Sequence, residues 1–288
     1  MSKIIFLFLC IFSYSVTAFA QSERQFRIID SITKEPIPYA TVRSIDYKIG
    51  TFTDTLGFFT INSSFTDSLI ISSVGYVNKK ISQQATVGDV VYLEQLIKEL
   101  QPITVKKRNL IGEKLFGILN GKKSTIWGSG GYGDEFTQKI LFPDTNKLYK
   151  IKTIAIGAER FDATIPMILH IYSIGKNGLP YQDLLSKKII ITKDHFNKKD
   201  KKIIIDITSE NMYINEGACF VGVEWLPVPS KGQRLPTTAL LLTDEIPERL
   251  TYSRAFFYNK DKWSMALSMP GQVNPSNTII SIKVDVFE

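Results

Sequence analysis

The fold is decided first by the stretch Gly50-Thr51-Phe52-Thr53-Asp54-Thr55-Leu56-Gly57-Phe58-Phe59-Thr60-Ile61. Residues with high β-propensity lie on both sides of the segment 54–57, which predicts two strands joined by a tight turn. Gly57 suits the positive-φ position that such a turn tends to need. Short strands punctuated by turns are therefore expected from Gln25 to about Val105.

The sequence on either side of this stretch also contains patterns typical of strands and turns. Upstream, Pro36 and Pro38 bracket Ile37, and residues before proline avoid the helical region, so the segment 37–42 enters a strand. Downstream, the runs Asp67–Ser72 and Val90–Leu93 are rich in β-formers, and a bend separates them at Val74-Gly75-Tyr76. These signals predict a small all-β unit.

The order of these motifs resembles a known family. The motifs are Ile37-Pro38-Tyr39-Ala40-Thr41-Val42, Thr53–Ile61, Asp67–Tyr76 and Leu100-Gln101-Pro102-Ile103-Thr104-Val105. Together they resemble the carboxypeptidase-D regulatory-like domain, although Phe26-Arg27-Ile28 stands where the family usually has Gly-x-Val. The resemblance implies a seven-stranded transthyretin-like sandwich over residues 21–106. It also implies a structural or interaction module without catalytic residues, common in exported Bacteroidetes proteins and ahead of TonB-dependent receptors.

The first 20 residues predict a signal peptide. Lys3 precedes the apolar run Ile4–Phe12, and Ala18-Phe19-Ala20 supplies small residues for cleavage before Gln21. Leu9, ahead of Cys10, argues against lipidation. No later run approaches the roughly 20 apolar residues of a membrane span. We therefore expect an exported protein located in the periplasm, at the outer-membrane surface or outside the cell.

The distribution of charge and the cysteine content indicate what kind of partner and what kind of cysteine to expect. The chain has 288 residues and a formal net charge of +7, with basic clusters at 106–108 and 198–202. Neither cluster is interleaved with stacking aromatics, so no nucleic-acid partner is expected. After signal cleavage Cys219 is the single cysteine, and its apolar run 218–221 predicts a small buried hydrophobe.

The remainder of the chain predicts a linker and a second β domain. Residues 107–133 read as a linker with one short helix between Asn109 and Asn120, because 128–133 are rich in glycine. Residues 134–288 predict a jelly-roll-like antiparallel β-sandwich with short strands and no helices between them. Runs such as 220–225 resemble uncharacterised C-terminal sandwiches that follow the same regulatory-like domain. The ten expected strands are 135–141, 149–157, 165–174, 188–192, 202–207, 218–225, 238–242, 252–257, 263–268 and 278–287.

Catalytic and metal motifs are absent from the sequence. No His-x-His, Cys-x-x-Cys or His-Glu-x-x-His spacing occurs, so no metal or other cofactor is expected. No Gly-x-Ser-x-Gly lies at a strand-to-helix junction, and the glycines of 117–124 have the wrong spacing for a phosphate loop. His170 is expected to be packed or hydrogen-bonded in a strand, and His195 to be solvated. We therefore expect no catalytic residues and no enzyme.

Paired carboxylates leave one catalytic alternative open. The pairs Asp134 with Glu135, Asp244 with Glu245, and Glu216 with Glu224 would approach each other in a dispersed glycosidase-like or peptidolytic site. Their placement at turns and strand ends favours solvated surface charge instead.

Aromatic residues of the later strands give the candidates for ligand binding. Their rings combine an apolar face with a polar edge, which suits stacking on sugars, although sandwich aromatics mainly fill the core. We single out Trp225, Tyr258 and Trp263. The sequence thus predicts a non-catalytic exported binding or assembly module acting through protein or glycan contacts. The alternatives are the dispersed-carboxylate enzyme and an accessory to a TonB-dependent outer-membrane transporter.

Overall fold

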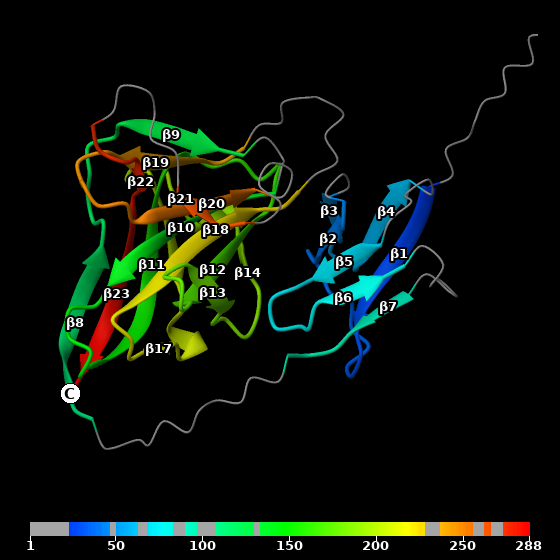
Figure 1. Cartoon of the computed structure of the whole chain (residues 1–288), viewed down its shortest axis with the longest axis horizontal. Helices are drawn as coiled ribbons and strands as arrows, with labels where there is room; N and C mark the ends of the chain where they lie inside the picture. Colours follow the sequence, from blue (N-terminus) through cyan, green and yellow to red (C-terminus); the bar gives the residue numbers. More distant parts are fainter. Residues whose placement is uncertain are drawn as a thin grey trace, which may run out of the picture.

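The computed structural model describes residues 23–46, 50–62, 68–82, 90–96, 108–129, 133–227, 237–255, 262–265 and 273–288. Over these residues the chain forms two β-sandwiches, the smaller one blue to cyan and the larger one green to red (Figure 1). The predicted all-β class is confirmed. The expected signal peptide lies outside the described residues. Within them, no helix has the length and apolar character of a membrane span.

The smaller sandwich packs a three-stranded sheet, ordered β4-β1-β7, against a four-stranded sheet, ordered β3-β2-β5-β6. β1 and β7 run parallel, and the other neighbours are antiparallel. Phe26, Ile28, Val42, Ile71 and Leu93 belong to its core. The seven predicted strands are present, with bounds β1 (Glu23–Asp30), β2 (Thr41–Ser44), β3 (Gly50–Phe52), β4 (Phe58–Asn62), β5 (Leu69–Ser72), β6 (Lys79–Ile81) and β7 (Val90–Leu93).

The turn between β3 and β4 has the predicted chemistry. Oδ1 of Asp54 accepts hydrogen bonds from the backbone N–H groups of Leu56 and Phe58, at 2.9 and 2.8 Å. Gly57 has φ +79°, and a Cβ there would lie 2.5 Å from the carbonyl oxygen of Ile28. Glycine is therefore required both for the left-handed backbone and for the close approach of β1.

The larger sandwich is antiparallel throughout. Its seven-stranded sheet contains β10 (Asp134–Leu141), β12 (Met167–Ile174), β13 (Pro180–Asp183), β14 (Ile189–Ile191), β18 (Ala218–Trp225), β20 (Thr251–Ala255) and β21 (Ser264–Met265). Its nine-stranded sheet contains β8 (Leu110–Gly117), β9 (Thr125–Gly128), β11 (Leu148–Arg160), β15 (Phe196–Asn197), β16 (Lys202–Asp206), β17 (Tyr213–Ile214), β19 (Ala239–Thr243), β22 (Asn277–Thr278) and β23 (Ile280–Phe287). Two 3₁₀ helices, η1 (Lys193–His195) and η2 (Thr208–Glu210), complete it. Each of the ten predicted strands overlaps one of these.

The predicted linker at 107–133, with its short helix, is wrong over residues 108–129. β8 pairs with β23 along its whole length, and β9 pairs with β19, so both belong to the larger sandwich. β8 lies at the sheet edge and is exposed on both faces, which removes the alternation that identifies a strand. β8 also contains Gly112 and Gly117, at φ +141° and +91°. Glycine is unfavourable inside a strand, so the segment was predicted as a linker.

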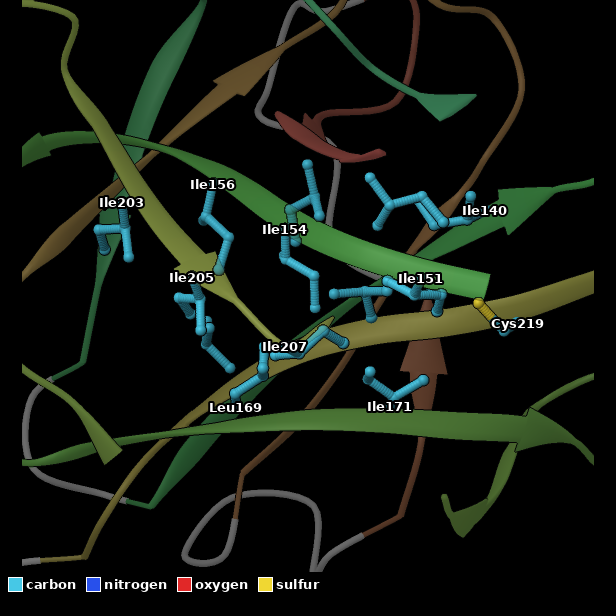
Figure 2. Close-up of a cluster of buried hydrophobic side chains, with 14 of the residues drawn as sticks. Ile140, Ile151, Ile154, Ile156, Leu169, Ile171, Ile203, Ile205, Ile207 and Cys219 are labelled. Atoms are coloured by element: carbon cyan, nitrogen blue, oxygen red, sulfur yellow. The ribbon is translucent and has the colours of Figure 1, made fainter. Parts of the chain in front are cut away.

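The core of the larger sandwich fills the space between its two sheets. Ile151, Ile154 and Ile156 of β11 meet Leu169 and Ile171 of β12 there (Figure 2). Side chains alternate between the two faces of a strand, so the residues between these core positions point to the opposite face of each sheet. For β12 that opposite face carries the candidate site.

Cys219 lies in this core, as predicted, and is 1% exposed. Burial raises the pKa of its thiol to about 12, with a further contribution from Glu216. Because the thiolate is the reactive form, we expect native protein lacking Cys10 to resist a maleimide reagent and unfolded protein to react fully. Mass spectrometry after a timed exposure measures this. Rapid labelling of the native protein would contradict the core placement.

Candidate functional site

The smaller sandwich stands beside the larger one (Figure 1), and its residues lie against part of the outer face of the seven-stranded sheet. Ile168, His170 and Tyr172 point to this face of β12, yet they are only 2%, 6% and 5% exposed. Val74, from the smaller sandwich, packs against the core of the larger one. Nζ of Lys188 donates hydrogen bonds to the carbonyl oxygens of Pro38, at 2.9 Å, and of Tyr39. The two sandwiches are therefore docked through specific contacts.

The bend at Val74-Gly75-Tyr76 is the docking element of the smaller sandwich. The Tyr76 hydroxyl donates to Oδ2 of Asp30 at 3.0 Å, and the Gln95 side-chain amide donates to the same oxygen at 2.7 Å. The Gln95 bond, with backbone N–H groups and Tyr76, outweighs burial and lowers the pKa of Asp30 to about 2. Asp30 thus remains ionised and ties the bend to the end of β1.

At Gly75 the backbones of the two sandwiches approach each other closely. It has φ +83°, and a Cβ at this position would overlap the carbonyl oxygen of Ser186. We expect Gly75→Ala to separate the sandwiches, which small-angle X-ray scattering would show as an increased radius of gyration. Gly178→Ala is the matched control, because Gly178 has φ +76° with nothing within 4 Å of its added Cβ. A compact Gly75→Ala protein, or equal expansion of both variants, would contradict the docking.

A histidine clamped between two carboxylates lies on the covered face. Nδ1 of His170 is 2.6 Å from Oδ2 of Asp183, and Nε2 is 3.1 Å from Oε2 of Glu224. Burial alone would lower the pKa of His170, but Glu135, Asp183 and Glu224 together outweigh it and raise the pKa to about 10. His170 is therefore a cation at neutral pH. In turn, its hydrogen bond and charge keep the pKa of Glu224 below the ordinary value despite burial.

A second ion pair stands beside the first. Glu135 of β10 lies directly opposite Glu224 of β18, and like charges in this relation repel. Arg254 offsets the repulsion, since its Nε lies 2.7 Å from Oε2 of Glu135, which is 1% exposed. The Tyr172 hydroxyl donates to Oε1 of the same carboxylate at 2.7 Å. The ring of Trp263 lies 4.5 Å beneath the Arg254 guanidinium.

A cavity of about 460 Å³ opens between the two sandwiches over this cluster. Arg43, Ser72 and Asn78 line it from the smaller sandwich, whereas His170, Asp183, Glu224 and Arg254 line it from the larger one. Tyr181 also lines it and is 75% exposed. The cavity is therefore lined both by an exposed aromatic ring and by paired charged groups.

Lys188 occupies the junction of this cavity and the docking contact. Burial lowers the pKa of its ammonium group to about 7, against the attraction of Glu224. Its hydrogen bonds to Pro38 and Tyr39 are made across the boundary between the sandwiches. Tyr39 has φ +54°, an uncommon conformation for a residue other than glycine. Lys188 therefore belongs both to the cavity wall and to the contact between the two sandwiches.

The protonation of His170 limits the chemistry that the cluster offers. Both ring nitrogens of His170 face carboxylates, which only accept hydrogen bonds when ionised, so the imidazolium has no lone pair for a general base. Among the described residues, no group of three or more His, Cys, Asp and Glu is arranged to hold a metal ion. The paired charges instead fix donors and acceptors in place around the cavity.

Of the three residues selected as ligand-binding candidates, the structure describes two, and they lie in different parts of it. Trp225 is fully buried in the core, 6.1 Å from the ring of Phe136, so its selection is wrong: it presents no face to a ligand. Its indole N–H has no hydrogen-bond partner among the described residues. Trp263 lies in the cluster, edge-on to Tyr172 at 5.8 Å. Tyr258 lies outside the described residues.

The proposed carboxylate pairs are not the ones that meet. Glu135 and Asp134 point to opposite sides of β10, with Asp134 bonded to the Ser129 hydroxyl at 2.5 Å. Glu216 precedes β18, whereas Glu224 is near its end. The structure instead brings Glu224 beside Glu135.

Asp183 and Arg254 are functional residues that the sequence did not reveal. They lie on β13 and β20, with β14 to β19 between them in sequence, and no motif spacing links them to His170. One signal was available: His170 and Tyr172 occupy alternate positions between Leu169 and Ile171, so a polar face runs along this apolar strand.

The fold and cavity define a β domain docked on a larger sandwich, and the first of these matches a known family. Residues 27–105 match the CarboxypepD_reg-like domain. Among curated proteins, none matches the chain. The resemblance found in the sequence is thereby confirmed for the smaller sandwich.

Solved structures give only distant similarity. Two structures of the cysteine protease Cwp84, a surface-layer-associated protein of Clostridium difficile, show TM-scores of 0.40 and 0.39 at 10% and 9% identity. They cover 78% and 86% of this chain, which spans 53% and 58% of theirs. The major pilin subunit BcpA of Bacillus cereus has a TM-score of 0.17 at 13% identity, covering 84% of this chain and 66% of its own. At these TM-scores the likeness carries no argument about function.

Proposed function

We propose that the protein is an exported, non-catalytic binding module of the Bacteroidetes cell envelope, with its ligand site in the cavity between the two sandwiches. The observation that carries this proposal is that both sandwiches contribute polar groups to one 460 Å³ cavity. Its volume falls within the roughly 300–1,000 Å³ of small-molecule sites. A glycan or a protruding segment of an envelope protein fits such a cavity.

Support for a non-catalytic role comes from His170 and its neighbours. A hydrolase of the two-carboxylate type needs one ionised carboxylate and one protonated carboxyl group. Here Asp183 and Glu224 are both hydrogen-bonded to the imidazolium of His170, and that bond keeps the pKa of Glu224 low. Glu224 is thus kept ionised, which does not suit a carboxyl group that must protonate a leaving group.

The proposal is tested with an array of envelope glycans and envelope proteins probed with the full mature chain. We expect saturable binding that Tyr181→Ala weakens at least tenfold, because this 75% exposed ring lines the cavity. Tyr213→Ala is the control, since Tyr213 lies on β17 and packs on Phe287. Binding that is unaffected by Tyr181→Ala would place the site elsewhere. Turnover of a bound glycan or peptide would instead support an enzyme.

A further inference from the structure

We infer that the cavity between the sandwiches binds a neutral, hydroxyl-rich ligand, an uncharged saccharide being the chemical class that fits it. This inference rests on the proposed binding function and narrows it to one kind of molecule. Its three supports are the pairing of the charges in the wall, the neutral polar groups around them, and the exposed ring of Tyr181.

Most charged groups of the wall are bonded within the protein, and Nζ of Lys188 donates to the carbonyl oxygens of Pro38 and Tyr39. His170 donates to both Asp183 and Glu224, and Arg254 is paired with Glu135. With both carboxylates ionised and therefore unable to donate, His170 supplies the proton of each bond. Arg43 adds a further positive charge that acts on Glu224. Charges of opposite sign are thus interleaved across the wall, and a ligand of either sign meets repulsion as well as attraction.

Neutral polar side chains make up much of the remaining lining. They are Thr41, Ser72, Ser73, Asn78 and Gln182. Hydroxyl and amide groups both donate and accept hydrogen bonds, as the hydroxyl groups of a sugar do. An ion bound among such groups would lose its hydration without gaining a matched counter-charge, whereas a polyol exchanges hydrogen bonds with water for equivalent ones.

Tyr181 supplies the apolar part of the site. Its ring is 75% exposed although it lines the cavity, so it presents a face to an incoming ligand. The C–H face of a sugar ring is apolar and its rim is polar, which matches an aromatic face placed beside hydrogen-bonding groups. A small inorganic anion would make no use of this ring.

The test compares three classes of probe by isothermal titration with the full mature chain. The neutral probes are a panel of unsubstituted hexose tetrasaccharides, the anionic probe is tetragalacturonate, and the peptide probe is an acidic hexapeptide. We expect saturable binding of at least one neutral tetrasaccharide, with less than a twofold change in affinity between 50 and 300 mM salt. Tyr181→Ala and Gln182→Ala should each weaken it at least fivefold, and Tyr213→Ala should not.

The outcomes separate this inference from the proposed function. Tighter binding of tetragalacturonate or of the peptide, lost in Tyr181→Ala, would overturn the neutral ligand and leave the binding module intact. Failure of every neutral tetrasaccharide to bind would also overturn the inference. Neutral binding that persists in both Tyr181→Ala and Gln182→Ala would overturn the cavity as the site, and with it the proposed function.

Discussion

Replacing His170 by alanine should lower the free energy of unfolding by about 3–5 kcal/mol, the usual cost of removing one partner from a buried ion pair. The imidazolium is the hydrogen-bonding cation for Asp183 and Glu224, and without it two partly buried carboxylates remain near the buried Glu135. Urea unfolding followed by tryptophan fluorescence measures the change as a lower midpoint at an unchanged slope.

His195→Ala is the matched control for this prediction. His195 is half-buried in η1, where its Nδ1 lies 3.0 Å from the backbone nitrogen of Thr192. We expect a loss below about 1 kcal/mol, as for other exposed or half-exposed positions. If His170→Ala cost no more than His195→Ala, the carboxylates would not depend on His170 for their charge balance.

Lys188→Met should expose a strong pH dependence of stability that the unmodified protein conceals. The folded pKa of His170 is raised to about 10, so its stabilising contribution is complete below pH 6.5 and is lost as the pH rises towards 10. The folded pKa of Lys188 is lowered to about 7, so between pH 7 and 10.5 the unfolded chain binds more protons there and stability rises with pH. The two effects oppose each other.

With Lys188 replaced, the contribution of His170 remains alone. We expect the free energy of unfolding of Lys188→Met to fall by about 2 kcal/mol between pH 6.5 and 8.5. Ionisation of the Cys219 thiol in the unfolded chain begins only at the upper end of this window and is common to all the proteins compared. The unmodified protein should change much less. Lys187→Met is the control, because Lys187 is exposed and pairs with Glu210, and it should follow the unmodified protein. Equal pH slopes in all three proteins would contradict the opposing titrations.

Much of the fold was predictable because it depends on local patterns. The run Ala218–Trp225 was predicted as a strand and is β18 with the same bounds, since its buried residues have high β-propensity. Gly57 was predicted from turn chemistry alone and has the expected φ. β8 was missed because an edge strand exposed on both faces leaves no alternation to read.

The site was less predictable because it depends on register and docking. His170 was expected to be packed or hydrogen-bonded, and it is, but its partners Asp183 and Glu224 come from two other strands. Strand order and register bring Glu135 and Glu224 together, and neither is encoded in residue spacing. The covering sandwich, which turns a solvated sheet face into a cavity, leaves no local signal in β12.

The docked smaller sandwich gives the family domain a defined role in this chain. Through Val74 and Gly75 it covers the polar face of the larger sandwich, and its residues complete the cavity wall. A ligand bound there contacts both sandwiches, so its affinity should depend on their docking.

If the two sandwiches together form one binding site, the affinity for a ligand depends on their docking, and one comparison of affinities decides whether it does. A neutral tetrasaccharide that binds the unmodified chain is titrated into Gly75→Ala and Gly178→Ala. We predict at least a tenfold loss of affinity in Gly75→Ala, where the added Cβ collides with Ser186, and less than a twofold change in Gly178→Ala, where it meets nothing. Unchanged affinity in a Gly75→Ala protein whose sandwiches have separated would contradict a shared site.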